Sequence, residues 1–455
     1  MAKQTHDCIV AGAGPAGSAA ALTMARAGLD VVMLERGDRP GQKNVMSGVL
    51  YTETLSELVP DYRQRAPLQR CITGGYAYHI LGEDWLLELP RLRDYSLVDH
   101  PAPHFTVFRS QFDDWFAREA EAAGVELFTA TLVEDLLWEG GRVVGVRTRR
   151  GDLRARVVIG ADGVNSTVAD KAGLMPKLQP DGAGLIARQI LDLPAEVIEE
   201  RFVLRPGEGA LSMFTGRVEG PSGRTGVYHG EIYTNHDSLS MTLDAPLDEL
   251  VRAGVPVYDA MDQWARHPHI ARLIQGASLR EYQAHLIPWG GPPDLDSLYG
   301  DGVLLAGDAG KINTREGVGS WPAMASGVAA ARTVQHALEQ GDVSAATLSR
   351  YHELLAEAGL VEYLAEARRG WWAGQDLLYA MANNPAATRR LATRYGEDVG
   401  DPASLHHRPL WVEAYQELVR ALTPSDLRPL LDEAADDATR HWRQLQDVQT
   451  HYQGW

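Results

Sequence analysis

The sequence predicts an α/β fold joined to a second, mainly β domain: a Rossmann-type nucleotide-binding domain, a β-sheet substrate domain and a C-terminal helical region. Three observations carry this prediction. A strand, a glycine turn, an alanine-rich helix and a second strand follow one another within residues 7–35, residues 186–290 are mostly β-patterned, and the chain is helical in pattern from about 346 onward. At 455 residues the chain is too long for one compact core, so we expect several domains around a shared cleft.

The first elements predict a parallel βαβ unit. Residues 7–11 (DCIVA) form a short apolar run, residues 18–28 (SAAALTMARAG) are typical of a helix that stops at Gly28, and residues 30–35 (DVVMLE) form a second β-branched run. A right-handed crossover places these two strands side by side and parallel.

Between the first strand and the helix lies the pattern G-x-G-x-x-G, formed by Gly12, Gly14 and Gly17. The first glycine permits a tight turn, the second admits a pyrophosphate close to the backbone, and the third lets the helix pack on the strand. Glu35, at the end of the second strand, suits the hydroxyls of an adenosine ribose. The unit therefore predicts a dinucleotide site, with the phosphates at the helix N-terminus.

Two further glycine segments indicate FAD rather than a freely exchanging nicotinamide. Residues 160–166 (GADGVNS) contain Asp162 and Gly163, and residues 302–310 (GVLLAGDAG) contain Gly307 and Asp308. An Asp beside glycines at a strand end can accept from a sugar hydroxyl while the glycine lets the backbone approach phosphate. We assign the ribitol of FAD to Asp308.

The remaining elements follow from periodicity. Residues 109–124 predict a helix with one buried face, residues 133–163 predict β-hairpins with turns at 140–141 and 151–152, and residues 226–243 form the clearest strand pair of the second sheet. We expect the FAD-binding domain at 1–80, 106–185 and 291–345, a β-rich cap segment at 81–105, the substrate or partner domain at 186–290 and the helical region at 346–455.

Composition excludes several classes of function. A formal net charge of −18 argues against a nucleic-acid partner. The 2 cysteines rule out a disulfide framework and a four-cysteine cluster in this chain. No apolar run reaches the roughly 18 residues of a membrane span, and a strand begins almost at once, without a secretory leader. We therefore expect a cytoplasmic protein, with peripheral contact at the inner face of the membrane left open.

No metal site is predicted. The histidine pairs 100/104, 267/269 and 406/407 lack convergent Cys, Asp or Glu spacing, so packing or surface roles are expected. Cys8 lies inside the first strand and is expected to be an inert core residue. The paired tryptophans at 371–372 favour an interdomain core over a bilayer or partner contact.

Taken in order, the three glycine segments resemble the FAD-dependent hydroxylase-type superfamily, whose FAD domain is of the glutathione reductase and hydroxylase type. Residues 35–51 (ERGDRPGQKNVMSGVLY), 193–210, 232–243 and 281–291 (EYQAHLIPWGG) narrow the resemblance to the FixC-type dehydrogenases and electron-transfer-flavoprotein:quinone oxidoreductases. The resemblance covers the chain from about 5 to 345. It implies electrons taken from an electron-transfer flavoprotein and passed to quinone or to a separate ferredoxin-like protein.

The resemblance also places Arg109 against the FAD pyrophosphate, although an Arg at a helix start pairs equally well with carboxylates. Helix 320–341 is expected to direct its N-terminus, near 317–319, at the flavin ring and to stabilise its reduced, anionic form. We further expect cofactor contacts from Pro15, Ala16, Arg36, Asn44, Ser47, Gly48, Val133, Gly317 and Gly319. No catalytic side chain is predicted, because the flavin itself stores the electrons.

Two departures from the resemblance keep a second hypothesis open. The cysteine set that holds an iron–sulfur cluster in the quinone oxidoreductases is absent, and residues 311–327 (KINTREGVGSWPAMASG) differ from the usual loop. Lys311, Arg315 and Trp321 in this loop mark either an altered substrate site or ordinary loop packing. The alternative is a stand-alone flavin oxidoreductase or monooxygenase acting on a small organic substrate. A non-catalytic binding protein is a third reading, disfavoured by the complete FAD pattern.

Overall fold

The computed structural model describes residues 5–42, 47–88, 93, 95–289, 295–313, 319–366, 382, 388, 389 and 393. Asn44, Arg315, Gly317, the tryptophan pair at 371–372 and most of the expected helical region 346–455 lie outside this range. Of Ser47, only the backbone is described.

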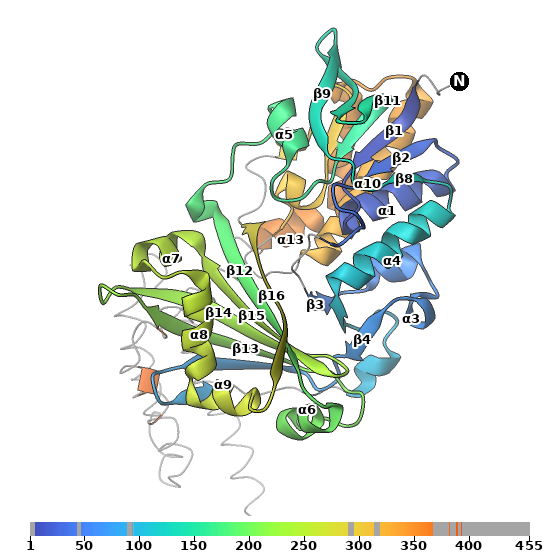
Figure 1. Cartoon of the computed structure of the whole chain (residues 1–455). Coiled ribbons are helices and arrows are strands. Elements are labelled where there is room, and N and C mark those ends of the chain that lie inside the picture. Colours follow the sequence, from blue (N-terminus) through green and yellow to red (C-terminus); the bar gives the residue numbers. More distant parts are fainter. Residues whose placement is uncertain are drawn as a thin grey trace, which may run out of the picture.

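The first domain is built on a sheet with the strand order β17-β18-β11-β1-β2-β8 (Figure 1). The predicted βαβ unit is confirmed as β1 (His6–Ala11), α1 (Pro15–Arg26) and β2 (Val31–Leu34), with β1 and β2 parallel. β8 (Glu126–Phe128), β11 (Gly151–Gly160) and β18 (Val303–Leu305) extend the parallel sheet, and β17 (Tyr299–Gly300) pairs antiparallel at its edge. The four residues of β2 are all apolar and all buried, as expected for a parallel strand covered on both faces.

The helices of this domain pack on one another, and small residues let α10 (Ser320–Gln340) approach α1 closely. α4 (Arg109–Ala122) and α10 both contact α1, and the two predicted helices at 109–124 and 320–341 are thereby confirmed. A Cβ added to Gly327 of α10 would lie 2.2 Å from the Ala16 carbonyl oxygen of α1. α2 (Glu53–Leu58), α3 (Tyr62–Arg65) and α5 (Thr167–Ala172) are short additions to the same domain.

One predicted turn lies elsewhere. β9 (Val133–Glu139) and β10 (Arg142–Thr148) are joined by the expected turn at 140–141. The next turn is at 149–150 rather than at 151–152, because Gly151 already pairs with Thr148 as the first residue of β11. The glycine has φ +125°, a conformation that favours glycine, and it begins the strand instead of forming the turn.

The second domain is a 7-stranded sheet ordered β16-β12-β15-β14-β13-β5-β6. Its strands are β5 (Tyr76–Leu81), β6 (Leu86–Glu88), β12 (Ala183–Asp192), β13 (Leu211–Glu219), β14 (Thr225–Thr234), β15 (Ser238–Pro246) and β16 (Ser278–Pro288). The predicted strand pair within 226–243 is confirmed as β14 and β15. β5 pairs with β13 and crosses the position between 80 and 81 where a domain boundary was expected, so the sheet also includes residues from the N-terminal part of the chain.

Four helices cover one face of this sheet, which the β pattern of 186–290 does not indicate. They are α6 (Ala195–Phe202), α7 (Leu247–Ala253), α8 (Val257–Arg266) and α9 (Pro268–Leu273) (Figure 1). Trp264 of α8 packs with Phe214 and Tyr228 of the sheet in a core of its own. The opposite face of the sheet is therefore the one turned toward the first domain.

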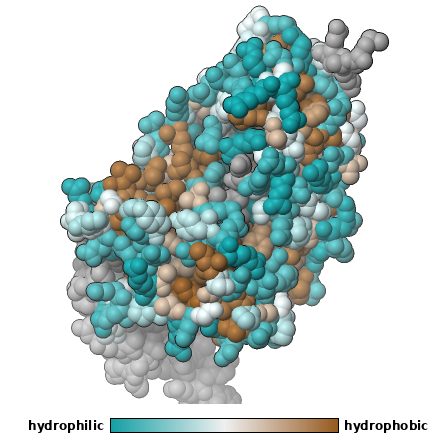
Figure 2. Space-filling model, viewed as in Figure 1, coloured by the Kyte–Doolittle hydropathy of each residue, from teal (hydrophilic) through white to brown (hydrophobic). Residues whose placement is uncertain are grey.

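The outer surface of this domain is mixed in character. Figure 2 shows a largely hydrophilic face on which hydrophobic residues gather in a few patches. Val251 of α7, Tyr258 of α8 and Leu279 of β16 are among the exposed large hydrophobic side chains.

A small sheet connects the two domains. It consists of β3 (Ser47–Leu50), β7 (Phe105–Phe108) and β4 (Leu68–Cys71), in the order β3-β7-β4. Short 3-10 helices occur at Tyr95–Asp99, Pro180–Gly182, Leu295–Leu298 and Gly307–Gly310. The described part of the C-terminal region, α11 (Ala345–Leu348), α12 (Arg350–Glu357) and α13 (Leu360–Glu366), packs on α10. Among the residues described, no helix is long and apolar enough to cross a membrane.

Candidate cofactor and substrate site

A cavity of about 750 Å³ lies between the parallel sheet and the helix-free face of the second sheet. Its size is within the range of small-molecule and cofactor sites. Most of the residues expected to contact FAD line it: Gly12, Gly14, Pro15, Ala16, Glu35, Arg36, Gly48, Arg109, Val133, Asp162, Gly163, Gly307, Asp308 and Gly319. Gly17 does not line it, and Asn44 and Gly317 lie outside the described residues.

Parallel strands bring the three glycine segments together. In the sheet, Ala11 of β1 lies beside Gly160 of β11, which lies beside Leu305 of β18. The segments that begin at Gly12, Ala161 and Ala306 therefore leave the same edge of the sheet, although they are about 150 residues apart in sequence. Ligands of open parallel sheets bind at this carboxyl edge.

The glycines of the first segment have distinct local environments. Gly12 has φ +105°, and an added Cβ would lie 2.2 Å from the Ala161 carbonyl oxygen. A Cβ on Gly17 would lie 1.9 Å from the Gly12 carbonyl oxygen, so this glycine serves the contact between helix and strand. Nothing lies within 4 Å of a Cβ placed on Gly14, which borders the cavity instead.

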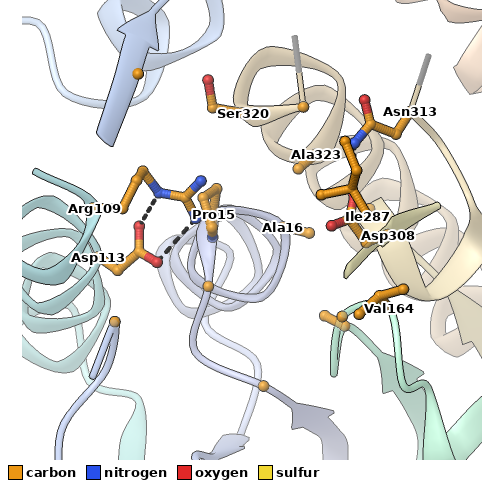
Figure 3. A pocket seen from close by; sticks show the side chains of 18 of the residues that line it. Pro15, Ala16, Arg109, Asp113, Val164, Ile287, Asp308, Asn313, Ser320 and Ala323 are labelled. Atoms are coloured by element: carbon orange, nitrogen blue, oxygen red, sulfur yellow. Dashed lines mark hydrogen bonds and ion pairs between the residues drawn. The ribbon is translucent and has the colours of Figure 1, made fainter. Parts of the chain in front are cut away.

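Two helix N-termini open toward the cavity without an acidic or capping side chain. α1 begins after Gly14 and α10 after Gly319, and neither helix has a side-chain cap or an acidic residue in its first turn. Figure 3 shows Pro15 and Ala16 of α1 near Ser320 and Ala323 of α10 around this space. The free N–H groups and the positive ends of both dipoles favour negative charge here.

Glu35 is a buried carboxylate fixed by backbone donors. The Ala13 N–H donates to Oε2 at 3.2 Å, and the Gly37 N–H donates to Oε1 at 2.7 Å. Burial raises the pKa of Glu35, while both amides lower it in part. The carboxylate is thus held at the end of β2 with lone pairs left to accept from a ribose hydroxyl.

Arg109 begins α4 and is not a surface cation. Its guanidinium donates to both oxygens of Asp113, at 2.6 and 2.9 Å, and its side chain is only 12% exposed (Figure 3). The buried Asp113 compensates the charge of Arg109 and fixes the plane of the guanidinium beside the cavity.

The two Asp side chains of the later glycine segments have different partners. Asp162 accepts from the Val168 N–H at 3.1 Å and from the Ser166 hydroxyl at 3.4 Å, so it holds the start of α5. Burial raises the pKa of Asp162 to about 6 despite these bonds. Asp308 accepts from the Asn313 amide at 3.3 Å, and burial raises its pKa against the lowering effects of Arg109 and Asn313. Asp308 therefore has more acceptor capacity left for a ligand.

The inner wall of the cavity was missed by sequence reasoning. The second sheet contributes Tyr76, Tyr78, Leu211, Met213, Glu231, Tyr233, His285 and Ile287, and Tyr51 lies beside them. Their strands place Leu211 opposite both Tyr76 and Tyr233, so one sheet face presents all these side chains. The sequence pattern that could have indicated this wall is the alternation of polar residues in β14, where His229, Glu231 and Tyr233 occupy every second position.

The two described residues singled out in the loop after Asp308 lie in different places. Trp321 lines the cavity, and its ring packs edge-on against that of Tyr363, with ring centroids 5.1 Å apart. Lys311 does not line the cavity, because its ammonium group donates to the Pro176 carbonyl oxygen at 2.9 Å.

Cys8 is buried in the core, and burial raises the pKa of its thiol. Within the described ranges no group of three His, Cys, Asp or Glu side chains could hold a metal ion.

Comparison with known proteins identifies the family. Residues 5–192 match the family model described as an FAD binding domain. Protein FixC of Azotobacter vinelandii is 39% identical over 378 residues, covering 80% of this chain and 84% of that protein. Protein FixC of Escherichia coli strain K12 is 37% identical over 367 residues, covering 79% and 83%.

Solved structures share the fold at lower identity. A geranylgeranyl bacteriochlorophyll reductase-like protein from Thermoplasma acidophilum superposes with a TM-score of 0.67 at 19% identity, covering 94% of this chain and 99% of that one. A flavin-dependent brominase gives a TM-score of 0.59 at 18% identity, covering 96% and 100%. These likenesses confirm the predicted FAD-binding fold and carry no information on substrate.

Fold, cavity and comparisons define an FAD-dependent oxidoreductase. The chain belongs to the FixC family. The cavity fits the cofactor on its own evidence: a glycine edge open to phosphate at Gly14, two uncapped helix N-termini and a backbone-held carboxylate at Glu35. FAD supplies two-electron storage when it is bound.

Proposed function

We propose that this protein is a FixC-type dehydrogenase that takes electrons from an electron-transfer flavoprotein and passes them to a quinone or to a separate ferredoxin-like protein. The observation that supports it is the continuity of the cavity. One space runs from the glycine edge of the parallel sheet to the inner wall on the second sheet. An organic acceptor held against that wall would lie next to the cofactor.

In this proposal the residues of the glycine edge bind and orient FAD. Glu35 would accept from the ribose hydroxyls, the N-terminus of α1 would bind the pyrophosphate, and Asp308 would accept from the ribitol. Arg109, fixed by Asp113, would lie near the pyrophosphate. The N-terminus of α10 would stabilise negative charge on the reduced ring.

The acceptor half of the cavity suits an apolar molecule with polar ends. Leu211, Met213 and Ile287 supply an apolar surface, while tyrosine hydroxyls and His285 supply hydrogen-bond groups. Burial lowers the pKa of His285, and the nearby Arg36 and Arg109 lower it further, so its imidazole is neutral near pH 7 and can accept a hydrogen bond. A membrane-held quinone would bring the otherwise cytoplasmic protein to the inner face of the membrane.

The test is an anaerobic visible spectrum of the purified protein, mixed in turn with reduced electron-transfer flavoprotein and with NAD(P)H. We expect the bound-flavin band to bleach rapidly with the flavoprotein and to persist with the nicotinamide. Bleaching by nicotinamide alone would exclude the proposed donor.

A second candidate is a stand-alone flavin oxidoreductase or monooxygenase acting on a small organic molecule. It is favoured by the polar groups of the inner wall, since Glu231, Tyr233 and His285 would orient a compact substrate as well as a quinone. NAD(P)H-dependent oxygen consumption, stimulated by such a substrate, would support it over the first proposal.

A further inference from the structure

Four polar side chains from three segments of the chain, Tyr51 and Glu53 from one of them, lie next to one another along the cavity wall. Glu53, the first residue of α2, has its Oε1 3.6 Å from Nε2 of His104. Nδ1 of His104 lies 2.8 Å from the hydroxyl of Tyr76 on β5. Tyr51 and Tyr76 both border the cavity, close enough for their phenols to interact. The ring of Tyr51 also packs on His104, with centroids 4.2 Å apart.

This chain of contacts leads from water to the interior. The side chain of Glu53 is 48% exposed and that of His104 is 29% exposed, so both can exchange protons with solvent. Tyr76 and Tyr51 are less exposed than Glu53, and all three border the cavity. Burial raises the pKa of both phenols, which therefore remain protonated in the functional pH range.

The inner end of this series of contacts, at Tyr51, adjoins the rest of the inner wall. Tyr51 lines the same cavity as Tyr78 and Glu231, and the negative charge of Glu231 disfavours a phenolate at Tyr51. Glu231 in turn accepts from the Tyr233 hydroxyl and lies 3.6 Å from Nε2 of His229. A neutral, protonated Tyr51 is therefore the polar group that the chain presents to a bound acceptor.

We propose that Glu53, His104, Tyr76 and Tyr51 form a proton relay that supplies one proton to the organic acceptor during its reduction. This inference rests on the proposed function, because it requires a quinone-class acceptor in the cavity. Reduction of a quinone to a quinol takes two electrons and two protons. Both electrons and one proton would come from the reduced cofactor, and the relay would provide the second proton.

Each group of the relay gains one proton for each proton that it gives up. The acceptor oxygen takes the proton of the Tyr51 hydroxyl, Tyr51 takes one from Tyr76, and Tyr76 takes one from His104. His104 is reprotonated from water, and the Glu53 carboxylate beside Nε2 stabilises the imidazolium. Only O–H and N–H bonds form and break, and each phenol ends as it began. Each hydroxyl can donate and accept at once, and an imidazolium between Tyr76 and Glu53 donates to both.

The test compares two oxidants of the same reduced protein. The FAD-loaded full chain is photoreduced without oxygen and mixed in a stopped-flow instrument with a short-chain quinone or with ferricenium, which takes an electron and no proton. Tyr76→Phe and His104→Gln break the relay at its middle. Tyr228→Phe, which removes a buried hydroxyl from the helix-covered face of the same sheet, is the matched control. The flavin band and circular dichroism establish folding of each variant.

We expect quinone to reoxidise Tyr76→Phe and His104→Gln about 100-fold more slowly than the parent protein, as for loss of a general acid. Reoxidation by ferricenium should stay within about twofold. Added imidazole should partly restore the rate of His104→Gln, because that site is near solvent. Equal slowing with both oxidants would assign these residues a purely structural role and overturn the relay, as would unchanged quinone rates. A parent protein that ferricenium reoxidises but quinone does not would overturn the proposed acceptor, and the relay with it.

Discussion

At the scale of single residues, Glu35 shows how backbone donors orient a side chain for a ligand. The amides of Ala13 and Gly37 fix both carboxylate oxygens. In Glu35→Gln one of these oxygens becomes an NH₂ group, which cannot accept from a backbone N–H. We expect about tenfold weaker FAD binding, in line with the loss of one charge-assisted hydrogen bond. Fluorescence titration of the apoprotein with FAD measures it, with the exposed Glu126→Gln of β8 as control.

Asp162 gives the protein a pH-dependent stability. Its pKa is raised to about 6, so between about pH 4 and pH 6 the folded protein keeps a proton that an unfolded Asp has released. Stability from this group is therefore present at low pH and is lost as the pH rises through about 6. We expect Asp162→Asn to remove about 1 kcal/mol of the fall in unfolding free energy between pH 5 and 7.

Urea denaturation at several pH values, with saturating FAD, measures this difference. Asp170→Asn, an exposed position on the same short helix, should leave the pH dependence as it is in the parent protein. If the unfolding free energy of Asp162→Asn and of the parent protein changed equally with pH, the Asp162 carboxyl would titrate in the normal range.

At the scale of elements, the packing of α1 depends on glycines whose roles can be separated. Gly17→Ala would place a methyl group 1.9 Å from the Gly12 carbonyl oxygen, and Gly327→Ala would place one 2.2 Å from that of Ala16. Backbone must move in both cases, so we expect each to destabilise the apoprotein by about 1–3 kcal/mol. Thermal denaturation without FAD measures this effect.

Gly14→Ala is the matched variant, for which we expect a loss of FAD binding and not of stability. Its methyl group meets nothing within 4 Å in the protein but projects at the edge of the cavity. We expect nearly unchanged stability without FAD and at least tenfold weaker FAD binding, because the pyrophosphate would need the same space. Tight FAD binding by Gly14→Ala would show that the phosphates lie elsewhere.

At the scale of the whole molecule, Arg70 joins the small sheet to the second domain. This buried side chain on β4 donates to the carbonyl oxygens of Asn235, His236 and Glu208, and it pairs with Glu199 of α6 at 2.8 Å. Arg70→Met would leave these acceptors without their donor. We expect a loss of about 1–3 kcal/mol in the free energy of unfolding, since the buried carbonyl oxygens lose their hydrogen-bond donor.

Urea denaturation, followed by tryptophan fluorescence, tests this prediction. Arg118→Met provides the comparison, because Arg118 is 48% exposed and pairs with Glu121 on the surface of α4. Its loss should change stability by less than about 1 kcal/mol. Similar effects of the two substitutions would mean that Arg70 is dispensable for joining the domains.

The sequence by itself determined the FAD-binding half of this protein. The glycine segments at 12–17, 160–163 and 307–308 are local: each requires particular residue types where the backbone turns or approaches phosphate, so each is visible in a few consecutive residues. The helices around 109–124 and 320–341 were equally visible through their periodicity. Segment 186–290 was recognised as β-rich, but its four short helices were not, because runs of six to ten residues carry too little periodicity.

Only the tertiary structure decided the composition of the inner wall and of the proposed relay. Tyr51, Tyr76, His104 and Glu231 lie in four different segments of the chain, and no spacing in sequence links them. They meet because β5 pairs with β13 in a sheet whose other strands come from residues 183–288, and because β7 crosses between β3 and β4. Strand order and register are long-range choices made by packing, which places side chains together that a local pattern cannot relate.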